Sequence, residues 1–226
     1  GYQALYSNTT GAGNIAIGYL AGDGVTTGLN NTLIGKDVTG GILTTGSSNV
    51  IIGAFSSPPT AATAGAVGMG YNLVTEGGYT TVGNSANDIR AAHGVATWAT
   101  VSDRRYKKDI VDSTAGLGFV NALQPRTFKY KTLGELPTTF RSYKANSTEV
   151  FKNSDTNHGF IAQEIKAAID AEPSIKDGFR MWDDREDGSQ EVAETALIPV
   201  LVKAIQELSA KNDALEARIV ALEPTA

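Results

Sequence analysis

The chain has 226 residues, no cysteine and a formal net charge of -5 at pH 7, with a pI near 5.1. This acidic balance argues against the broad cationic surface that sequence-independent nucleic-acid binding needs. The missing thiols exclude disulfides and thiolate metal sites, and no apolar run approaches the roughly 20 residues that span a bilayer. We therefore expect neither a nucleic-acid partner nor membrane insertion.

Charge and glycine divide the chain into two unlike parts. Residues 1–100 carry 2 of the 19 Lys and Arg residues, 4 of the 24 Asp and Glu residues and 19 of the 25 glycines. Such a division indicates two different kinds of structure. We predict a glycine-rich β-repeat stalk at residues 1–100, a folded body at 101–195 and a C-terminal helix at 196–226. Because the first residue falls in mid-pattern, we interpret the chain as a piece of a longer protein.

Five related units follow one another in the first part, and each ends in glycine. They occupy residues 14–18, 31–35, 49–53, 66–70 and 79–83, and their closing glycines are 17, 18, 17 and 13 residues apart. A fixed internal period predicts a repeat architecture in which each unit adds one turn and one short strand. A disordered low-complexity segment is the alternative, but flexible linkers do not keep Ile or Val at a fixed place before glycine.

Within each unit, the residues one and three places after the first share one side of the strand and are mostly aliphatic. We predict that this side is the core. One unit buries too few aliphatic side chains to offset the ordering of its own backbone, so we expect adjacent units and other chains to close the apolar face. The pairs are Ile15 with Ile17, Thr32 with Ile34, Val50 with Ile52, Val67 with Met69, and Thr80 with Val82.

A serine and a lysine stand five residues apart where the repeats give way to the charged part. A serine hydroxyl becomes nucleophilic when a base removes its proton, and a neutral lysine amine can be that base. The cationic neighbours Arg104, Arg105 and Lys108 disfavour the protonated form of Lys107, and burial at a subunit contact would act in the same direction. Ser102 and Lys107 are therefore candidates for a nucleophile and its base.

The spacing of this pair also predicts its local structure. Residues five apart do not share a helix face, so we expect Ser102 on a turn and Lys107 in the first turn of a following helix. Asp103 would suit the N-terminus of that helix electrostatically. The alternative is an exposed charged linker that merely caps a helix.

Other polar residues in the chain have less specific roles. His158 could orient the base or donate a hydrogen bond to a developing oxyanion, and a structural role for it is equally open. We expect His93 to be structural, and Gln163 and Glu164 to lie on the polar side of an amphipathic helix. Residues 183–188 are acidic but lack the ligand spacing of a calcium loop, so we predict a solvated turn. We expect no metal and no cofactor.

From residue 198 onward, apolar side chains recur at heptad spacing, which predicts a parallel coiled coil. Ile at a, Leu at d and one Asn at a favour two strands by the dimer rules, so the heptad by itself leaves dimer and trimer open. Charged pairs across g and e positions are Lys211 with Glu216 and Arg218 with Glu223. The a positions are Ile198, Ile205, Asn212 and Ile219, and the d positions are Leu201, Leu208, Leu215 and Leu222.

The repeat Thr-Gly-x-x-Asn-x-x-Ile-Gly resembles the stalk repeats of phage tail fibres and, more loosely, the head repeats of trimeric autotransporter adhesins. From Val101 onward the chain resembles the intramolecular chaperone domain at the C-terminus of phage endosialidase tailspikes and other trimeric fibres. Further matching segments are residues 123–130, 158–164 and 204–208. The family motif Ser-Asp-x-Arg-x-Lys is matched by Ser102, Asp103, Arg105 and Lys107.

This resemblance implies a homotrimer and a sequence of events. The chaperone would align three chains and fold the stalk, its client; Ser102 would then attack the Val101–Ser102 bond and release the chaperone. The implied fold class is mixed: an all-β repetitive trimeric stalk of β-helix or β-roll type, then an α+β chaperone domain ending in a parallel coiled coil. The resemblance also implies a fibre on the virion, assembled in the host cytoplasm, that contacts a host receptor or glycan.

Three other functions compete with this prediction. A trimeric adhesin or receptor-binding fibre tip would use the C-terminal domain only to trimerise and would never cut itself. A membrane-anchored transcription factor with the same module would bring a basic DNA-binding region and a transmembrane helix, and neither is in this sequence. A glycan-degrading enzyme would need a carboxylate pair, whereas residues 1–100 contain only Asp23, Asp37, Glu76 and Asp88.

Overall fold

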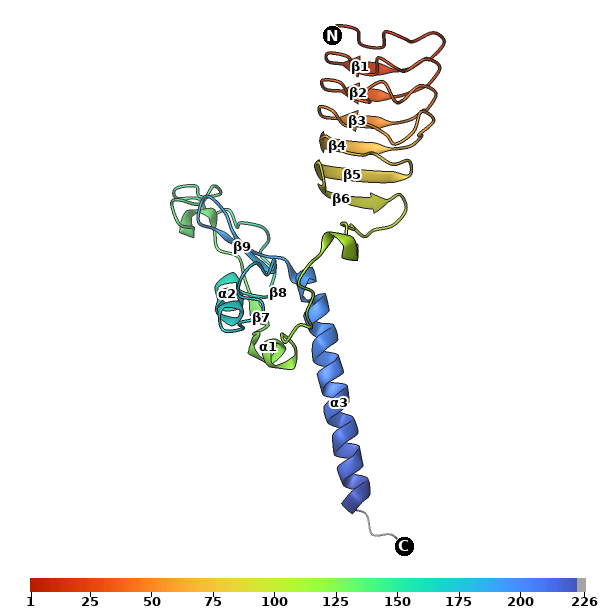
Figure 1. Ribbon diagram of the computed structural model, residues 1–226. Coiled ribbons are helices and arrows are strands. Elements are labelled where there is room, and N and C mark those ends of the chain that lie inside the picture. Colours follow the sequence, from red (N-terminus) through yellow and green to blue (C-terminus); the bar gives the residue numbers. More distant parts are fainter. Residues whose placement is uncertain (223–226) are drawn as a thin grey trace. The chain divides into compact units, whose positions relative to one another are not determined.

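The computed structural model describes residues 1–222 and consists of two compact units, one from Gly1 to Lys108 and one from Asp109 onward. The fold is mixed: the first unit is a β-solenoid-like stack of strands, and the second combines helices with two short antiparallel strand pairs (Figure 1). The turn that carries Ser102 and Lys107 belongs to the first unit. None of the helices described within residues 1–222 has the length and apolar character needed to cross a bilayer.

One strand forms in each predicted repeat unit, and the strands stack into a single sheet in chain order (Figure 1). The first five are parallel and in register, so that Ile15 lies beside Thr32, and Thr32 beside Val50. The sixth returns antiparallel to the fifth and ends the stack. The strands are β1 (Ile15–Ile17), β2 (Thr32–Ile34), β3 (Val50–Ile52), β4 (Val67–Tyr71), β5 (Tyr79–Asn84) and β6 (Asn87–Ala92).

The predicted core face of these strands points away from the interior of the coil. Ile15 and Ile17 are 51% and 57% exposed, whereas Leu33 and Ile51, at the middle position of their strands, are fully buried. The alternation is as predicted, but within the single chain this side is not the core, and its closure by other chains stays a prediction. Each turn of the coil closes on itself around a narrow interior. The strand side contributes its middle residue to this interior, and residues from the other sides of the turn fill the remaining space. Those other residues are Val25, Val38 and Leu43.

A ladder of asparagine side chains runs along the buried corner of the coil. Asn31 Nδ2 donates to Asn14 Oδ1 at 3.0 Å and to the Gly46 carbonyl at 3.0 Å, while Asn49 N and Nδ2 donate to Asn31 Oδ1 at 3.1 and 2.9 Å. Asn31 and Asn49 are fully buried. The amides replace backbone hydrogen bonds that the turns cannot make, which explains why the first three units begin with Asn.

The closing glycines let successive turns approach closely. Gly53 has a φ of +127°, and a Cβ built there would lie 1.6 Å from the carbonyl oxygen of Gly70 in the next turn. No side chain fits at this distance, so the repeat needs glycine at this place for both its backbone conformation and its contact.

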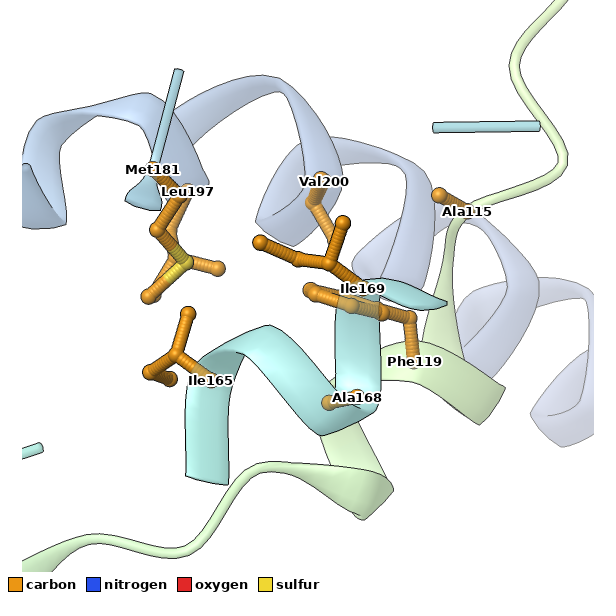
Figure 2. Close-up of a cluster of buried hydrophobic side chains, with 8 residues drawn as sticks. All are labelled: Ala115, Phe119, Ile165, Ala168, Ile169, Met181, Leu197 and Val200. Atoms are coloured by element: carbon orange, nitrogen blue, oxygen red, sulfur yellow. The ribbon is translucent and has the colours of Figure 1, made fainter. Parts of the chain in front are cut away.

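Three helices enclose the core of the second unit, as Figure 2 shows. They are α1 (Leu117–Ala122), α2 (Ala162–Asp170) and α3 (Ile198–Leu222). α2 buries Ile165 and Ile169 on one side, which confirms the predicted amphipathic helix. The buried side chains of this core are Ala115, Phe119, Ile165, Ala168, Ile169, Met181, Leu197 and Val200.

Two antiparallel strand pairs and short 3-10 turns complete this unit. β7 (Arg126–Phe128) pairs antiparallel with β8 (Asn157–Gly159), and β9 (Trp182–Asp184) with β10 (Gln190–Val192). The first two residues of the acidic segment 183–188 therefore belong to β9, and the rest form the turn of the β9–β10 hairpin. In this turn Asp187 accepts hydrogen bonds from Arg141 N and Ser189 Oγ. The 3-10 turns are η2 (Leu133–Glu135) and η3 (Glu194–Leu197).

Helix α3 buries one side in the body and leaves its heptad stripe exposed. Val200 and Ala204 are 4% exposed, whereas Ile205, Leu208 and Leu215 are about half exposed or more. The stripe predicted from the sequence is thus free of intrachain contacts that would bury it. Glu223, of the predicted Arg218–Glu223 pair, lies outside the described residues.

Candidate functional site

The side chains of Ser102 and Lys107 meet at the end of the first unit. Lys107 Nζ lies 2.6 Å from Ser102 Oγ and donates a hydrogen bond to it. This distance is within the range that proton transfer between a nucleophile and its base requires. The contact lies directly after Val101 in the chain, and its use as a nucleophile and base stays a prediction.

A short turn produces this contact. Asp103 precedes the 3-10 helix η1 (Arg104–Tyr106) as its N-cap and accepts a hydrogen bond from Arg105 N at 2.8 Å. The Arg105 guanidinium also binds both carboxylate oxygens, from Nη2 to Oδ2 at 2.7 Å and from Nε to Oδ1 at 3.0 Å. The hydrogen bonds from the Arg105 guanidinium, and to a smaller extent the one from Arg105 N, hold the pKa of Asp103 below its usual value. Asp103 and Arg105 therefore stabilise the shape of the turn.

Lys107 does not begin a helix, which corrects the prediction for its local structure. It is the C-cap of the single 3-10 turn, with its N–H donating to Arg104 O at 3.0 Å and an extended backbone. Residues five positions apart do not share a helix face, so a helix running through both positions would separate Lys107 from Ser102. One tight turn followed by extended backbone brings the chain back on itself, so the long lysine side chain reaches the hydroxyl.

Both members of the pair are exposed to solvent within the described chain, and Val101 is 58% exposed. The turn itself therefore does not exclude water from the pair. Burial of Lys107 at a subunit contact remains a prediction.

The two histidines have different surroundings. His158 lies in β8 of the second unit, opposite Thr127 of β7, and its side chain is exposed. The described contacts do not link it to Ser102 or Lys107, so its part in the chemistry stays a prediction. His93 Nε2 lies 3.3 Å from Thr80 Oγ1 within the first unit, as a structural histidine would.

Comparison with known proteins bears on this site. Residues 102–172 match the model of a peptidase family described as the chaperone of endosialidase. The match begins at Ser102, the proposed nucleophile, and it supports a chaperone role and a peptidase origin for this region. No curated protein matched the chain, and neither did a solved structure.

Two family-like segments that are far apart in the sequence meet inside the matched region. Arg126, from segment 123–130, binds Glu164, from segment 158–164, through two hydrogen bonds of 2.8 and 3.0 Å. From the sequence, Glu164 was predicted to be a surface or interface residue. The available signal for this contact was an acidic residue placed after an apolar segment within a family-like motif. The sequence did not indicate which residue it would bind.

A third segment, 204–208, also makes a specific contact that the sequence did not predict. Glu207 Oε2 in α3 accepts a hydrogen bond from Leu117 N at 2.9 Å and so caps the start of α1. A Cβ at Gly116 would lie 2.5 Å from the same carboxylate, so the glycine makes room for the cap. The contact ties the start of the second unit's body to its C-terminal helix.

Proposed function

We propose that this chain is the C-terminal part of a phage tail fibre or tailspike-like protein that folds its β-stalk with an intramolecular chaperone and then cuts itself at Val101–Ser102. The observation that carries the proposal is the 2.6 Å contact between Lys107 Nζ and Ser102 Oγ. It occurs at the first residue of the region that matches the chaperone of endosialidase family. Ser102 is the nucleophile and Lys107 the general base.

The cleavage has two steps. Neutral Lys107 takes the hydroxyl proton of Ser102, and Oγ bonds to the carbonyl carbon of Val101. The bond from that carbon to Ser102 N breaks, the nitrogen leaves with the proton from Lys107, and an ester joins Val101 to Oγ. Water then hydrolyses the ester, which yields a Val101 carboxylate and restores the serine hydroxyl on a new amino terminus. Both reacting groups are in one chain, so positioning replaces the binding of an external substrate.

Assembly into a homotrimer is the second part of the proposal. The stalk exposes aliphatic side chains such as Ile15 and Ile17, and α3 exposes Ile205 and Leu208. Further copies of the chain would cover these exposed apolar stripes. Burial of Lys107 in the trimer would disfavour its charged form. The cut would then follow assembly, and the mature stalk would rely on its unfolding barrier.

We infer the location of the protein in the virion and in the host from the family resemblance. We assign the mature fibre to the virion, its assembly to the host cytoplasm and its outward contact to a host receptor or glycan. The chaperone leaves after the cut. Electron microscopy of particles labelled on each side of residue 101 tests this assignment, because only the stalk label should remain on mature virions.

Denaturing gel electrophoresis with intact-mass analysis tests the cleavage. The natively assembled chain should give fragments 1–101 and 102–226, and Ser102→Ala or Lys107→Ala should give one full-length band. Ser113→Ala and Lys129→Ala, which change an exposed serine and an exposed lysine elsewhere, are the matched controls and should still cut. If both dyad variants split at the same bond, the assignment is wrong.

A specific observation favours one competing function. Ser102 and Lys107 are exposed in the described chain. The competing function is therefore a trimeric adhesin or receptor-binding fibre tip, in which this turn is a simple linker and the chain never cuts itself. The natively assembled wild-type chain would then stay at full length, which the same gel detects.

A further inference from the structure

The last turn of the stalk holds the chain just before the proposed cleavage site. Arg90 in β6 forms an antiparallel bridge with Ala99, on the side of β6 that β5 leaves free. Arg90 N donates to Ala99 O at 2.9 Å, and Ala99 N donates to Arg90 O at 2.8 Å. Thr100 Oγ1 also donates to Asp88 O at 3.2 Å. The two residues before Val101 are therefore tied to β6.

Arg90 is in turn held by the preceding turns of the coil. Its Nη1 lies 2.8 Å from Glu76 Oε2, and its guanidinium lies 4.7 Å from the centre of the Tyr79 ring. The return segment is fixed as well, because His93 N donates to Gly78 O at 2.8 Å. Residues 99 and 100 thus acquire a defined place only when β5 and β6 have formed.

We propose that Arg90 and Ala99 are positioning residues for self-cleavage, which make the cut conditional on completion of the last stalk turn. This inference rests on the proposed function. The Val101 carbonyl lies between two anchors, the Arg90–Ala99 bridge before it and the Ser102–Lys107 contact after it. A hydroxyl attacks a carbonyl from a narrow range of directions, so a loose carbonyl reacts slowly.

The two anchors depend on different amounts of structure. The contact of Ser102 with Lys107 joins residues five positions apart and needs only the local turn, whereas the bridge to Arg90 needs the hairpin of β5 and β6. A chain with an unfinished stalk would hold the pair but leave the carbonyl free, and it would not cut. The order of events, folding before cleavage, follows from this difference.

Rate measurements on the full chain test the inference. Chains are assembled at acidic pH, where the amine is protonated, and cleavage is started by a jump to alkaline pH. Ala99→Pro removes the donor to Arg90 O and should slow cleavage about tenfold to hundredfold. Thr97→Pro is the control, because Thr97 N makes no hydrogen bond among residues 1–222; it should cut at the wild-type rate.

Two readouts separate positioning from a folding defect. A folding defect lowers the fraction of chains that finally cut, whereas loose positioning lowers the rate constant and leaves that fraction unchanged. The pH dependence of the rate should keep its midpoint, since the turn of Ser102 and Lys107 is untouched. In the uncut Ser102→Ala chain, adding Ala99→Pro should leave the melting temperature of the stalk unchanged.

A charge exchange provides a second test that does not depend on proline. Glu76→Arg and Arg90→Glu should each slow cleavage several-fold, on the order of what an exposed ion pair contributes, and the double variant should recover the rate. If Ala99→Pro folds but cuts at the wild-type rate, or if the exchange variants all cut alike, the inference is wrong while the Ser102 assignment stands. A wild-type chain that never cuts overturns the proposed function and this inference together.

Discussion

The guanidinium of Arg126 binds both carboxylate oxygens of Glu164, with Nη2 to Oε1 at 2.8 Å and Nε to Oε2 at 3.0 Å. The pair joins the residue that opens β7 to the first turn of α2, across 38 positions in the sequence. The hydrogen bonds of Arg126 hold the pKa of Glu164 below its usual value. The carboxylate therefore contributes most when it is ionised.

Removing the arginine should raise the pKa of Glu164. We expect Arg126→Met to return it to the ordinary range, measured by NMR titration of the Glu164 side-chain carbon. Since the folded-state pKa is depressed, the stabilisation is present above the unfolded pKa and is lost as pH falls through the folded value. The melting temperatures of wild type and Arg126→Met should therefore converge in acid. Arg180→Met, in the same unit, should leave Glu164 unchanged; equal titration of Glu164 in all three chains would contradict the prediction.

Gly53→Ala should disrupt the stacking of the stalk turns. The new Cβ would lie 1.6 Å from Gly70 O, and the backbone would also be strained, so we expect a loss of about 3 kcal/mol or more in unfolding free energy. Gly41→Ala is the matched control, because Gly41 has a φ of +70° but no atom within 4 Å of its Cβ position. It should cost about 1 kcal/mol. Denaturant unfolding measures both, and equal losses would refute the close approach.

Asn31→Ala should open the buried ladder. It leaves the Asn49 N–H and the Gly46 carbonyl without their side-chain partner, which should cost about 3 kcal/mol or more. Amide hydrogen exchange at Asn49 should speed up at the same time. Asn84→Ala, at an exposed position of β5, should change neither quantity. Unchanged exchange at Asn49 in the Asn31 variant would show that the ladder does not protect it.

Leu208→Lys should weaken assembly without unfolding the second unit. Leu208 is 48% exposed in the chain, so a charge there disturbs only what covers the heptad stripe. Analytical ultracentrifugation should report a lower oligomer mass. Gln206→Lys places the same charge off the stripe and should keep the wild-type mass. A wild-type chain that sediments as a monomer would contradict the trimer itself.

Sequence reasoning located the strands well, but the side that it predicted as the core faces outward within the single chain. The spacing of the closing glycines placed β1 to β5 because each strand is a local consequence of its own repeat. Alternation shows that Ile15 and Ile17 share a side, but it does not show which side faces inward. That depends on how the chain closes its coil, and the closed coil buries Leu33 and Ile51 instead. The more apolar side was left outside.

The candidate site shows the same difference between what local sequence predicts and what depends on distant segments. From the sequence by itself, Ser102 and Lys107 could be predicted as a pair and Asp103 could be placed at the start of a helical turn, because these residues lie within six consecutive positions and their contacts need only a local turn. Only the tertiary structure decided that Arg126 meets Glu164, that Glu207 caps α1 and that Arg90 holds Ala99. Such partners depend on where distant segments come to rest, and the packing of the whole unit sets those positions.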